Sequence, residues 1–203
     1  MITRFDIDER VREWSLREDV VEKDYVLGWL LWGIGTDETL GLNWVFKGGT
    51  CLKKCYLETY RFSEDLDFTV MPGGPVREEE IRPLLQRVLA RIHEASGIQF
   101  GDREPMLKTH ESGRYTQGRV YYRGPRNAPQ VASIILDLSA SEKIARPTVL
   151  RNISHAFRVC QLKQSGSRQR ITSAWSWATR IGSARSNPTL SDAPVRGTSS
   201  WLR

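Results

Sequence analysis

Two short segments of the chain bring together glycines, a hydroxyl and carboxylates at spacings that could do chemistry. The first, FKGGT, spans residues 46–50, and the second, RFSEDLDF, spans residues 61–68. Two glycines between an expected strand and an expected helix expose backbone N–H groups that can hold a triphosphate at the helix N-terminus. Two aspartates in alternate positions of a strand point to one face, where they suit hard, oxygen-seeking Mg²⁺. The combination predicts phosphate chemistry.

The first segment predicts a nucleotide-binding turn. We expect Gly48 and Gly49 to supply backbone donors, while Thr50 can add a hydroxyl. Lys47 can add a positive charge near the phosphates, and the alternative is an exposed lysine at a strand end. The G-x-x-x-x-G-K-[ST] spacing of a P-loop is absent from the segment, so the turn is of another kind.

The second segment predicts a metal site. Asp65 and Asp67 are the expected Mg²⁺ ligands, because two adjacent carboxylates repel each other unless a cation lies between them. Two-metal phosphoryl transfer also uses a third carboxylate from a neighbouring strand. Asp137 interrupts an apolar run and is the candidate, and its alternative is a strand-end aspartate paired with Lys143 or an arginine. Arg61 could contact the triphosphate or pair with a nearby carboxylate.

The surrounding pattern indicates the elements that must position these residues. Helices are expected from the capping-box sequence at 15–18 to about Gly33–Gly35, from a Thr50 cap to about Tyr60, and from near Pro83 to Gly97. Strands are expected at 43–46, 66–70, 118–122 and 131–139. The alternation of strands and helices predicts an α+β or α/β fold with a small mixed sheet flanked by helices.

The net charge of +6 comes from the end of the chain. Residues 161–203 contain seven basic residues and one acidic residue, which leaves 23 of each sign in residues 1–160. We therefore expect a folded domain over 1–157 and a basic, Ser/Arg-rich tail over 158–203. A disordered arm and translation in a shifted frame both explain the tail's composition, and a tail that contacts RNA is a further possibility.

Several function classes are excluded by composition. The longest apolar run, residues 26–35, is too short to cross a bilayer, and the N-terminal MITRFDIDER lacks an apolar signal stretch. The 3 cysteines form no framework pattern, which indicates a reducing, cytoplasmic setting. Cys51 and Cys55 lack a second ligand pair, so we expect a small apolar helix face there. None of the 3 histidines is assigned a catalytic role.

The two segments at this spacing resemble the DNA-polymerase-β-type nucleotidyltransferases and, more narrowly, the AbiEii/AbiGii toxin family. VEKDY at 21–25 and IILDL at 134–138 are similar as well, and the resemblance covers roughly residues 15–157. It implies a polymerase-β-like nucleotidyltransferase fold. It also implies Mg²⁺-dependent transfer of a nucleotide from an NTP with loss of pyrophosphate.

The resemblance also implies residue roles and partners. Gly49 and Thr50 would hold phosphates, Asp65 and Asp67 would bind Mg²⁺, and Asp137 would be the third carboxylate. Family members are toxins of toxin–antitoxin or phage-defence pairs, and some modify the acceptor end of tRNA. A tRNA acceptor and a cognate antitoxin are therefore the expected partners, with no membrane.

The last part of the chain departs from the family. Family members carry an E-K-x-x-A/R-L segment and a later R-D-x-x-D segment, and nothing in residues 158–203 matches either. The alternative hypothesis is therefore a catalytically inactive remnant that at most binds a partner.

Overall fold

The computed structural model describes residues 2–57, 63–144, 147–154, 157 and 170–173. A mixed sheet with the strand order β3-β4-β5-β2-β1-β7-β6 forms its centre. The helices are α1 (Arg4–Trp14), α2 (Glu18–Gly35), α3 (Leu40–Asn43), α4 (Gly48–Cys55) and α5 (Glu78–Ser96). The strands are β1 (Trp44–Lys47), β2 (Asp65–Val70), β3 (Met106–Thr109), β4 (Tyr115–Tyr122), β5 (Ala132–Ser139), β6 (Val149–Asn152) and β7 (Arg170–Ser173). This arrangement confirms the expected mixed sheet with flanking helices.

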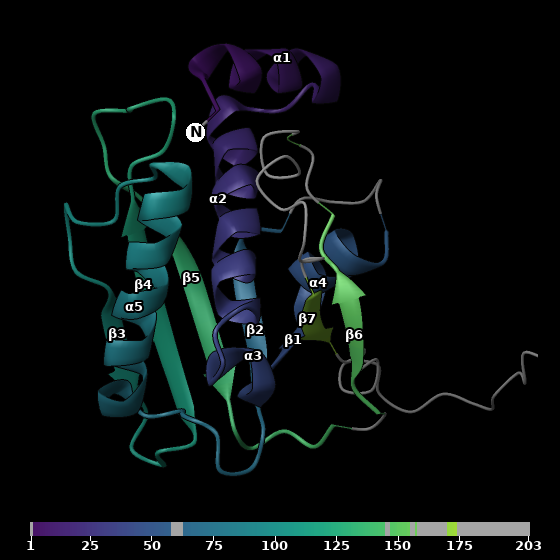
Figure 1. Ribbon diagram of the computed structural model, residues 1–203, viewed down its shortest axis with the longest axis vertical. Helices are drawn as coiled ribbons and strands as arrows, with labels where there is room; N and C mark the ends of the chain where they lie inside the picture. Colours follow the sequence, from purple (N-terminus) through teal and green to yellow (C-terminus); the bar gives the residue numbers. More distant parts are fainter. Residues whose placement is uncertain (1, 58–62, 145–146, 155–156, 158–169, 174–203) are drawn as a thin grey trace, which may run out of the picture.

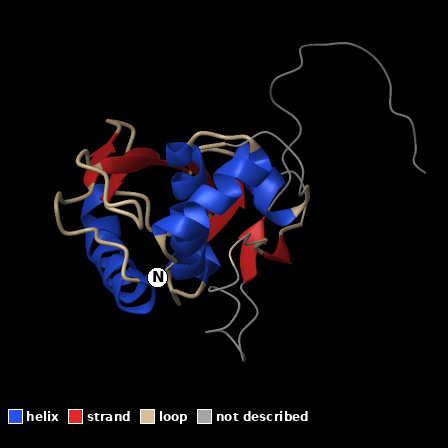
Figure 2. Ribbon diagram, turned by 90° about the horizontal axis from the view of Figure 1, so that it is seen from above, coloured by secondary structure: helices blue, strands red, loops and turns tan. Residues whose placement is uncertain are grey.

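Strand β2 lies near the middle of the sheet and pairs with two strands of opposite sense. It runs antiparallel to β1 and parallel to β5, while β5 and β4 are antiparallel. Helices α2 and α5 lie side by side across one face of the sheet, and α1 crosses over one end of α2 (Figure 1). Seen from above, the helices and the sheet form two layers (Figure 2).

The core lies between these layers, where the central strands place buried apolar residues at alternate positions. On β2 and β5 the apolar residues Leu66, Phe68, Leu136 and Leu138 are buried. The rings of Phe46 and Phe68 pack with their centroids 5.3 Å apart. The polar residues of the same strands therefore point to the opposite face.

Four expected helix boundaries were wrong, one of them the end of α4, which lies at Cys55 rather than about Tyr60. Ser15 does not begin α2: it is the C-cap of α1, in a left-handed conformation with φ of 53°, and Arg17 is the N-cap of α2. Thr50 does not cap α4, because the helix already begins at Gly48 with Lys47 as its N-cap. Helix α5 begins at Glu78 rather than near Pro83.

The early start of α5 has a local cause. The Glu80 carboxylate accepts hydrogen bonds from the backbone N–H groups of Val76 and Arg77, at 3.0 and 3.1 Å. These bonds satisfy donors that a helix start leaves free, so the helix forms ahead of Pro83. The expected stop at Gly97 is confirmed, since this residue is the C-cap with φ of 77°.

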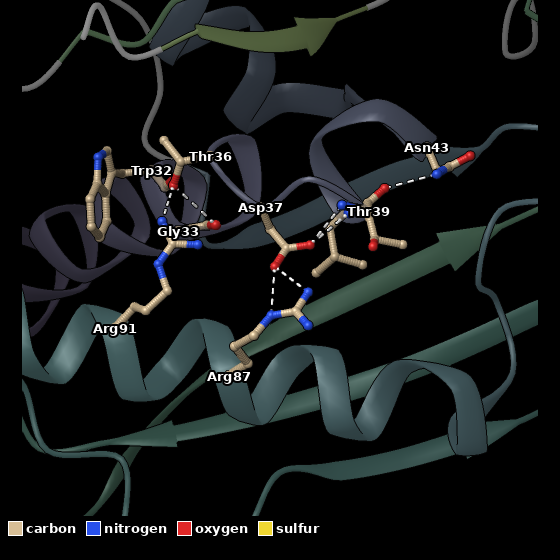
Figure 3. A network of polar contacts seen from close by, with 9 residues as sticks. Trp32, Gly33, Thr36, Asp37, Thr39, Asn43, Arg87 and Arg91 are labelled. Atoms are coloured by element: carbon tan, nitrogen blue, oxygen red, sulfur yellow. Dashed lines mark hydrogen bonds and ion pairs between the residues drawn. The ribbon is translucent and has the colours of Figure 1, made fainter. Parts of the chain in front are cut away.

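A polar network fastens the turn after α2 to α5 (Figure 3). The buried Asp37 accepts hydrogen bonds from the backbone N–H groups of Thr39 and Leu40, each at 3.0 Å. Arg87 of α5 donates to the other oxygen of the same carboxylate at 2.7 Å. The Asp37 charge is thus matched from both sides, which fixes the entry into α3 and β1.

Only residues 170–173 of the expected tail lie within the described part of the chain. They form β7, whose backbone runs parallel to β1 and antiparallel to β6. Arg61, Cys160 and the rest of 158–203 lie outside the described residues, so the boundary at 157/158 stays a prediction. Among the residues described, no helix is both long and apolar enough to cross a membrane.

Candidate active site

The strand register places four of the polar residues in one row across the sheet. Lys47 of β1 lies opposite Asp67 of β2, Asp67 lies opposite Asp137 of β5, and Asp137 lies opposite Gln117 of β4. Asp65 is on the same face as Asp67, because the two alternate with buried apolar residues. The structure thus brings the three aspartates named from the sequence onto adjacent strands.

The glycine turn lies directly against the second of these aspartates. Gly48 has φ of 77°, a conformation that favours glycine, and a Cβ at this position would lie 2.1 Å from Asp67 Oδ2. None of the described side chains caps the N-terminus of α4, whose first backbone N–H groups have no partner within the helix. The N-terminus of α4 and the Asp67 carboxylate are therefore immediate neighbours.

Thr50 occupies a different place from the one its predicted role suggests. Its side chain is buried, and its hydroxyl donates a 2.6 Å hydrogen bond to the backbone carbonyl of Asp65. This bond ties the first turn of α4 to the start of β2. A Cβ on Gly49 would come within 3.2 Å of Ser63 Oγ, so the chain also approaches this glycine closely. Phosphate binding by Gly49 and Thr50 stays a prediction.

Burial and like charge act together on the aspartates. The pKa of Asp65 is raised, first by burial and then by the charges of Asp137 and Glu64. The pKa of Asp67 is also raised by burial and by the Asp137 charge, against a lowering influence of Lys47. Within the described residues, no ion pair neutralises Asp65 or Asp67 directly. A cation at this face of the sheet would reduce the repulsion among the three carboxylates.

Lys47 has a carboxylate partner that is not part of the row. Its ammonium forms an ion pair with Glu142, whose carboxylate also accepts a 3.1 Å hydrogen bond from the Thr69 hydroxyl. Glu142 follows β5, and sequence reasoning did not single it out. Lys47 is thus a mostly buried, paired lysine at the end of β1, and its role toward phosphate stays a prediction.

Two residues that the sequence did not indicate contact Asp137. Tyr115 Oη donates to Asp137 Oδ1 at 3.0 Å, and Gln117 Nε2 donates to the same oxygen at 3.1 Å. The strand was expected to begin at 118, so both residues fell outside it. Extending the alternation of Arg119 and Tyr121 towards the N-terminus would have placed Gln117 and Tyr115 on the face that carries Asp137.

A buried ion cluster anchors α4 from behind. Asp24 of α2 accepts hydrogen bonds from Lys53 and Lys54 of α4, each at 2.7 Å. The backbone carbonyl of Lys54 also accepts a 2.7 Å hydrogen bond from the N–H of Ser154. The VEKDY segment therefore contributes the carboxylate that positions the helix carrying the glycine turn.

The donor set suits a hard divalent cation. The three aspartates offer oxygen ligands only, and the repulsion among them decreases when a cation binds. Across the described part of the chain, no three His, Cys, Asp or Glu side chains already form a cluster that could hold a metal ion. Cys51 is buried and Cys55 is half-buried, and both lie on α4 without a disulfide among the described residues, as expected for a small helix face.

The aromatic pair at the end of β4 packs within the protein. Both Tyr121 and Tyr122 are buried, and they lie opposite Ser133 and Ala132 of β5. The Arg103 guanidinium stacks over the Tyr121 ring at 4.3 Å from its centroid. Both rings therefore pack against the protein itself.

Comparison with known proteins gives the family. The model of the family described as nucleotidyl transferase AbiEii toxin, type IV toxin–antitoxin system, matches residues 29–163. No curated protein matches the chain. Among solved structures the chain is similar to MenT4, a nucleotidyltransferase toxin from Mycobacterium tuberculosis H37Rv, with 25% identity and a TM-score of 0.52. The similarity covers 86% of this chain and 55% of that one, so the chain spans little more than half the length of MenT4. Because the family model matches well over half of its residues, the chain belongs to the AbiEii nucleotidyltransferase toxin family.

Proposed function

We propose that the chain is a Mg²⁺-dependent nucleotidyltransferase toxin that transfers a nucleotide from an NTP to an acceptor hydroxyl. The observation that carries the proposal is the contact of the Gly48 turn with Asp67, which itself lies opposite Asp137. A triphosphate held at the N-terminus of α4 would extend beside these carboxylates. Membership of the AbiEii family supports the same reaction.

The glycine turn, the lysine and the three aspartates have separate roles in this proposal. Backbone N–H groups of Gly48 and Gly49 would bind phosphate oxygens, and Lys47 would add a positive charge. Asp65 and Asp67 would hold Mg²⁺, with Asp137 as the third carboxylate. Bound Mg²⁺ supplies charge that offsets the triphosphate and polarises its oxygens.

The reaction is an exchange at the α-phosphorus. A bond forms between the acceptor oxygen and the α-phosphorus while the bond to the bridging β-phosphate oxygen breaks. Pyrophosphate leaves with the electron pair, and the hydroxyl proton passes to the medium. The half-buried position of the aspartates favours this chemistry because charge interactions are stronger where water is scarce.

Family membership also suggests a proposal for the acceptor and the partners. We infer a tRNA acceptor end and a cognate antitoxin, in a cytoplasmic phage-defence pair. The similar structure is that of a nucleotidyltransferase toxin, and the family description is that of a toxin–antitoxin system. An inactive remnant that binds only a partner is the competing proposal.

A transfer assay tests the function. The full chain is incubated with Mg²⁺, total tRNA and each of the four α-labelled NTPs. We expect label on RNA, and Asp67→Asn should reduce transfer at least about 100-fold because a ligand charge is lost. Asp102→Asn is the matched control, since Asp102 pairs only with Arg123 in the described structure and lies outside the row.

The possible outcomes separate the proposals. Transfer that survives Asp67→Asn unchanged would contradict the residue assignment. Failure of the folded wild-type chain to transfer any of the four nucleotides to RNA or to a cellular protein extract would favour the remnant.

A further inference from the structure

The Asp137 carboxylate is held asymmetrically by the neighbouring strand. The two hydrogen bonds from Tyr115 Oη and Gln117 Nε2, at 3.0 and 3.1 Å, both end on Oδ1. The hydrogen bonds of the described residues include none to Oδ2. A carboxylate fixed through one oxygen has its plane defined and its second oxygen available.

The register explains why these two donors reach the same oxygen. Gln117 lies directly opposite Asp137 across the antiparallel pair of β4 and β5, and Tyr115 lies opposite Ser139. Tyr115 therefore approaches diagonally from the same face. On the other side of Asp137, β2 places Asp67 opposite it. Asp137 thus stands between two donors and a second carboxylate.

The two donors contribute to this face rather than to the core. Tyr115 is 37% exposed, and Gln117 is exposed, whereas their neighbours Thr116 and Gly118 on β4 are buried. Their side chains therefore hold little of the fold together. A hydrogen bond to an ionised carboxylate is worth more than one between neutral groups, so their main energetic effect falls on Asp137.

We propose that Tyr115 and Gln117 are positioning residues that present Asp137 Oδ2 to a divalent cation shared with the aspartates of β2. The inference rests on the proposed function, because it requires the metal site of that reaction. Hydrogen bonds to a ligating carboxylate fix the direction of its free oxygen and stabilise its charge. Without them, repulsion from the β2 aspartates would turn Asp137 away.

Direct Mn²⁺ binding to the full chain tests the proposal without measuring catalysis. The variants are Tyr115→Phe, Gln117→Met and their combination, and the probe is Mn²⁺ alone, followed by electron paramagnetic resonance and calorimetry. Each single change should weaken Mn²⁺ binding roughly 10-fold, and the pair up to roughly 100-fold. In an Asp137→Asn background the pair should have no further effect beyond about twofold.

Tyr121→Phe is the matched control, because Tyr121 lies on the same strand and face as Tyr115 but contacts Arg103. It should bind Mn²⁺ like the wild type. Thermal unfolding without metal should show a Tm lower by about 3–12 °C for each lost hydrogen bond to the charged carboxylate, and Mn²⁺ binding is therefore measured well below the lowest Tm. Wild-type affinity in the double variant would overturn the proposal, as would equal weakening in Tyr121→Phe.

The outcome is separable from that of the proposed function. Mn²⁺ binding that depends on Tyr115 and Gln117 supports the positioning role even if no nucleotide is transferred. A wild-type chain that binds no Mn²⁺ overturns the positioning role whatever the transfer assay shows.

Discussion

The contact between Gly48 and Asp67 predicts that Gly48→Ala lowers the free energy of unfolding through two effects that can be measured separately. Gly48 has φ of 77°, and a Cβ there would lie 2.1 Å from Asp67 Oδ2 and 3.0 Å from its Cγ. The variant therefore combines backbone strain with a steric overlap. The overlap can be relieved only by moving the Asp67 carboxylate or the turn, and either change separates the two proposed halves of the site.

Gly73 allows the two contributions to be measured apart. It has φ of 82°, but a Cβ there would meet nothing within 4 Å. Gly73→Ala should therefore show the left-handed strain alone, about 1–2 kcal/mol. Gly48→Ala should add about 1–3 kcal/mol for the overlap. For a chain of this length the additional loss corresponds to a Tm lower by about 2–12 °C.

Thermal and urea unfolding of the single and double variants measure the overlap. In an Asp67→Ala background the nearest Asp67 atom is Cβ at 3.2 Å, so most of the overlap disappears. We expect Gly48→Ala to cost there only what Gly73→Ala costs. An equal penalty for Gly48→Ala with and without the Asp67 carboxylate would refute the reasoning. So would a Gly48→Ala variant as stable as Gly73→Ala.

Three further predictions concern the charges around the site. Asp24→Asn leaves two buried lysines without their carboxylate, so urea unfolding should show a loss of about 3–5 kcal/mol, against at most about 1 kcal/mol for Asn at the exposed Asp19. Burial lowers the pKa of Lys53 from 10.5 to about 8. Between pH 8 and 10.5 the Lys53 side chain is therefore protonated in the unfolded chain but not in the folded one, so the free energy of unfolding should rise with pH in this range. Lys53→Met should flatten that rise when urea unfolding is measured at several pH values. Glu142→Gln should strengthen tripolyphosphate binding about twofold to fivefold in calorimetry by releasing Lys47, and Lys47→Met should abolish the gain.

The sequence could predict that both aspartates of β2 lie on one face, because the alternation of a strand involves only neighbouring positions. Asp65 and Asp67 alternate with apolar residues, and the structure buries Leu66 and Phe68 while leaving the aspartates on the other face. The partner of this face was only partly predictable. Asp137 was recognised as a carboxylate within an apolar strand, but its position opposite Asp67 depends on the parallel pairing of β2 with β5.

Residues whose role depends on long-range packing were not predictable. Extending the alternation of 118–122 back to Tyr115 puts Tyr115 and Gln117 on one face, but nothing in the sequence shows that Asp137 of β5 lies opposite that face. The signal at Ser15 was real as a local pattern, but the preceding helix uses that residue as its own end. Within the core-forming helix, nothing in the sequence paired Asp24 with lysines of α4.

The carboxylates of this fold divide into two kinds by how their charge is balanced. Asp24 and Asp37 are both buried, and each is matched by its own lysine or arginine, so the pKa of each is lowered despite burial. Asp65 and Asp67 are less buried, yet their pKa values are raised, first by burial and then by the charge of Asp137, and no ion pair of the described residues offsets these two effects. A fold that neutralises two aspartates internally has the means to neutralise the others. The unbalanced pair lies beside the one helix N-terminus that Gly48 brings against Asp67. We infer that the charges of Asp65 and Asp67 are left without an ion-pair partner because they bind a cation, beside a helix N-terminus that binds a phosphate group.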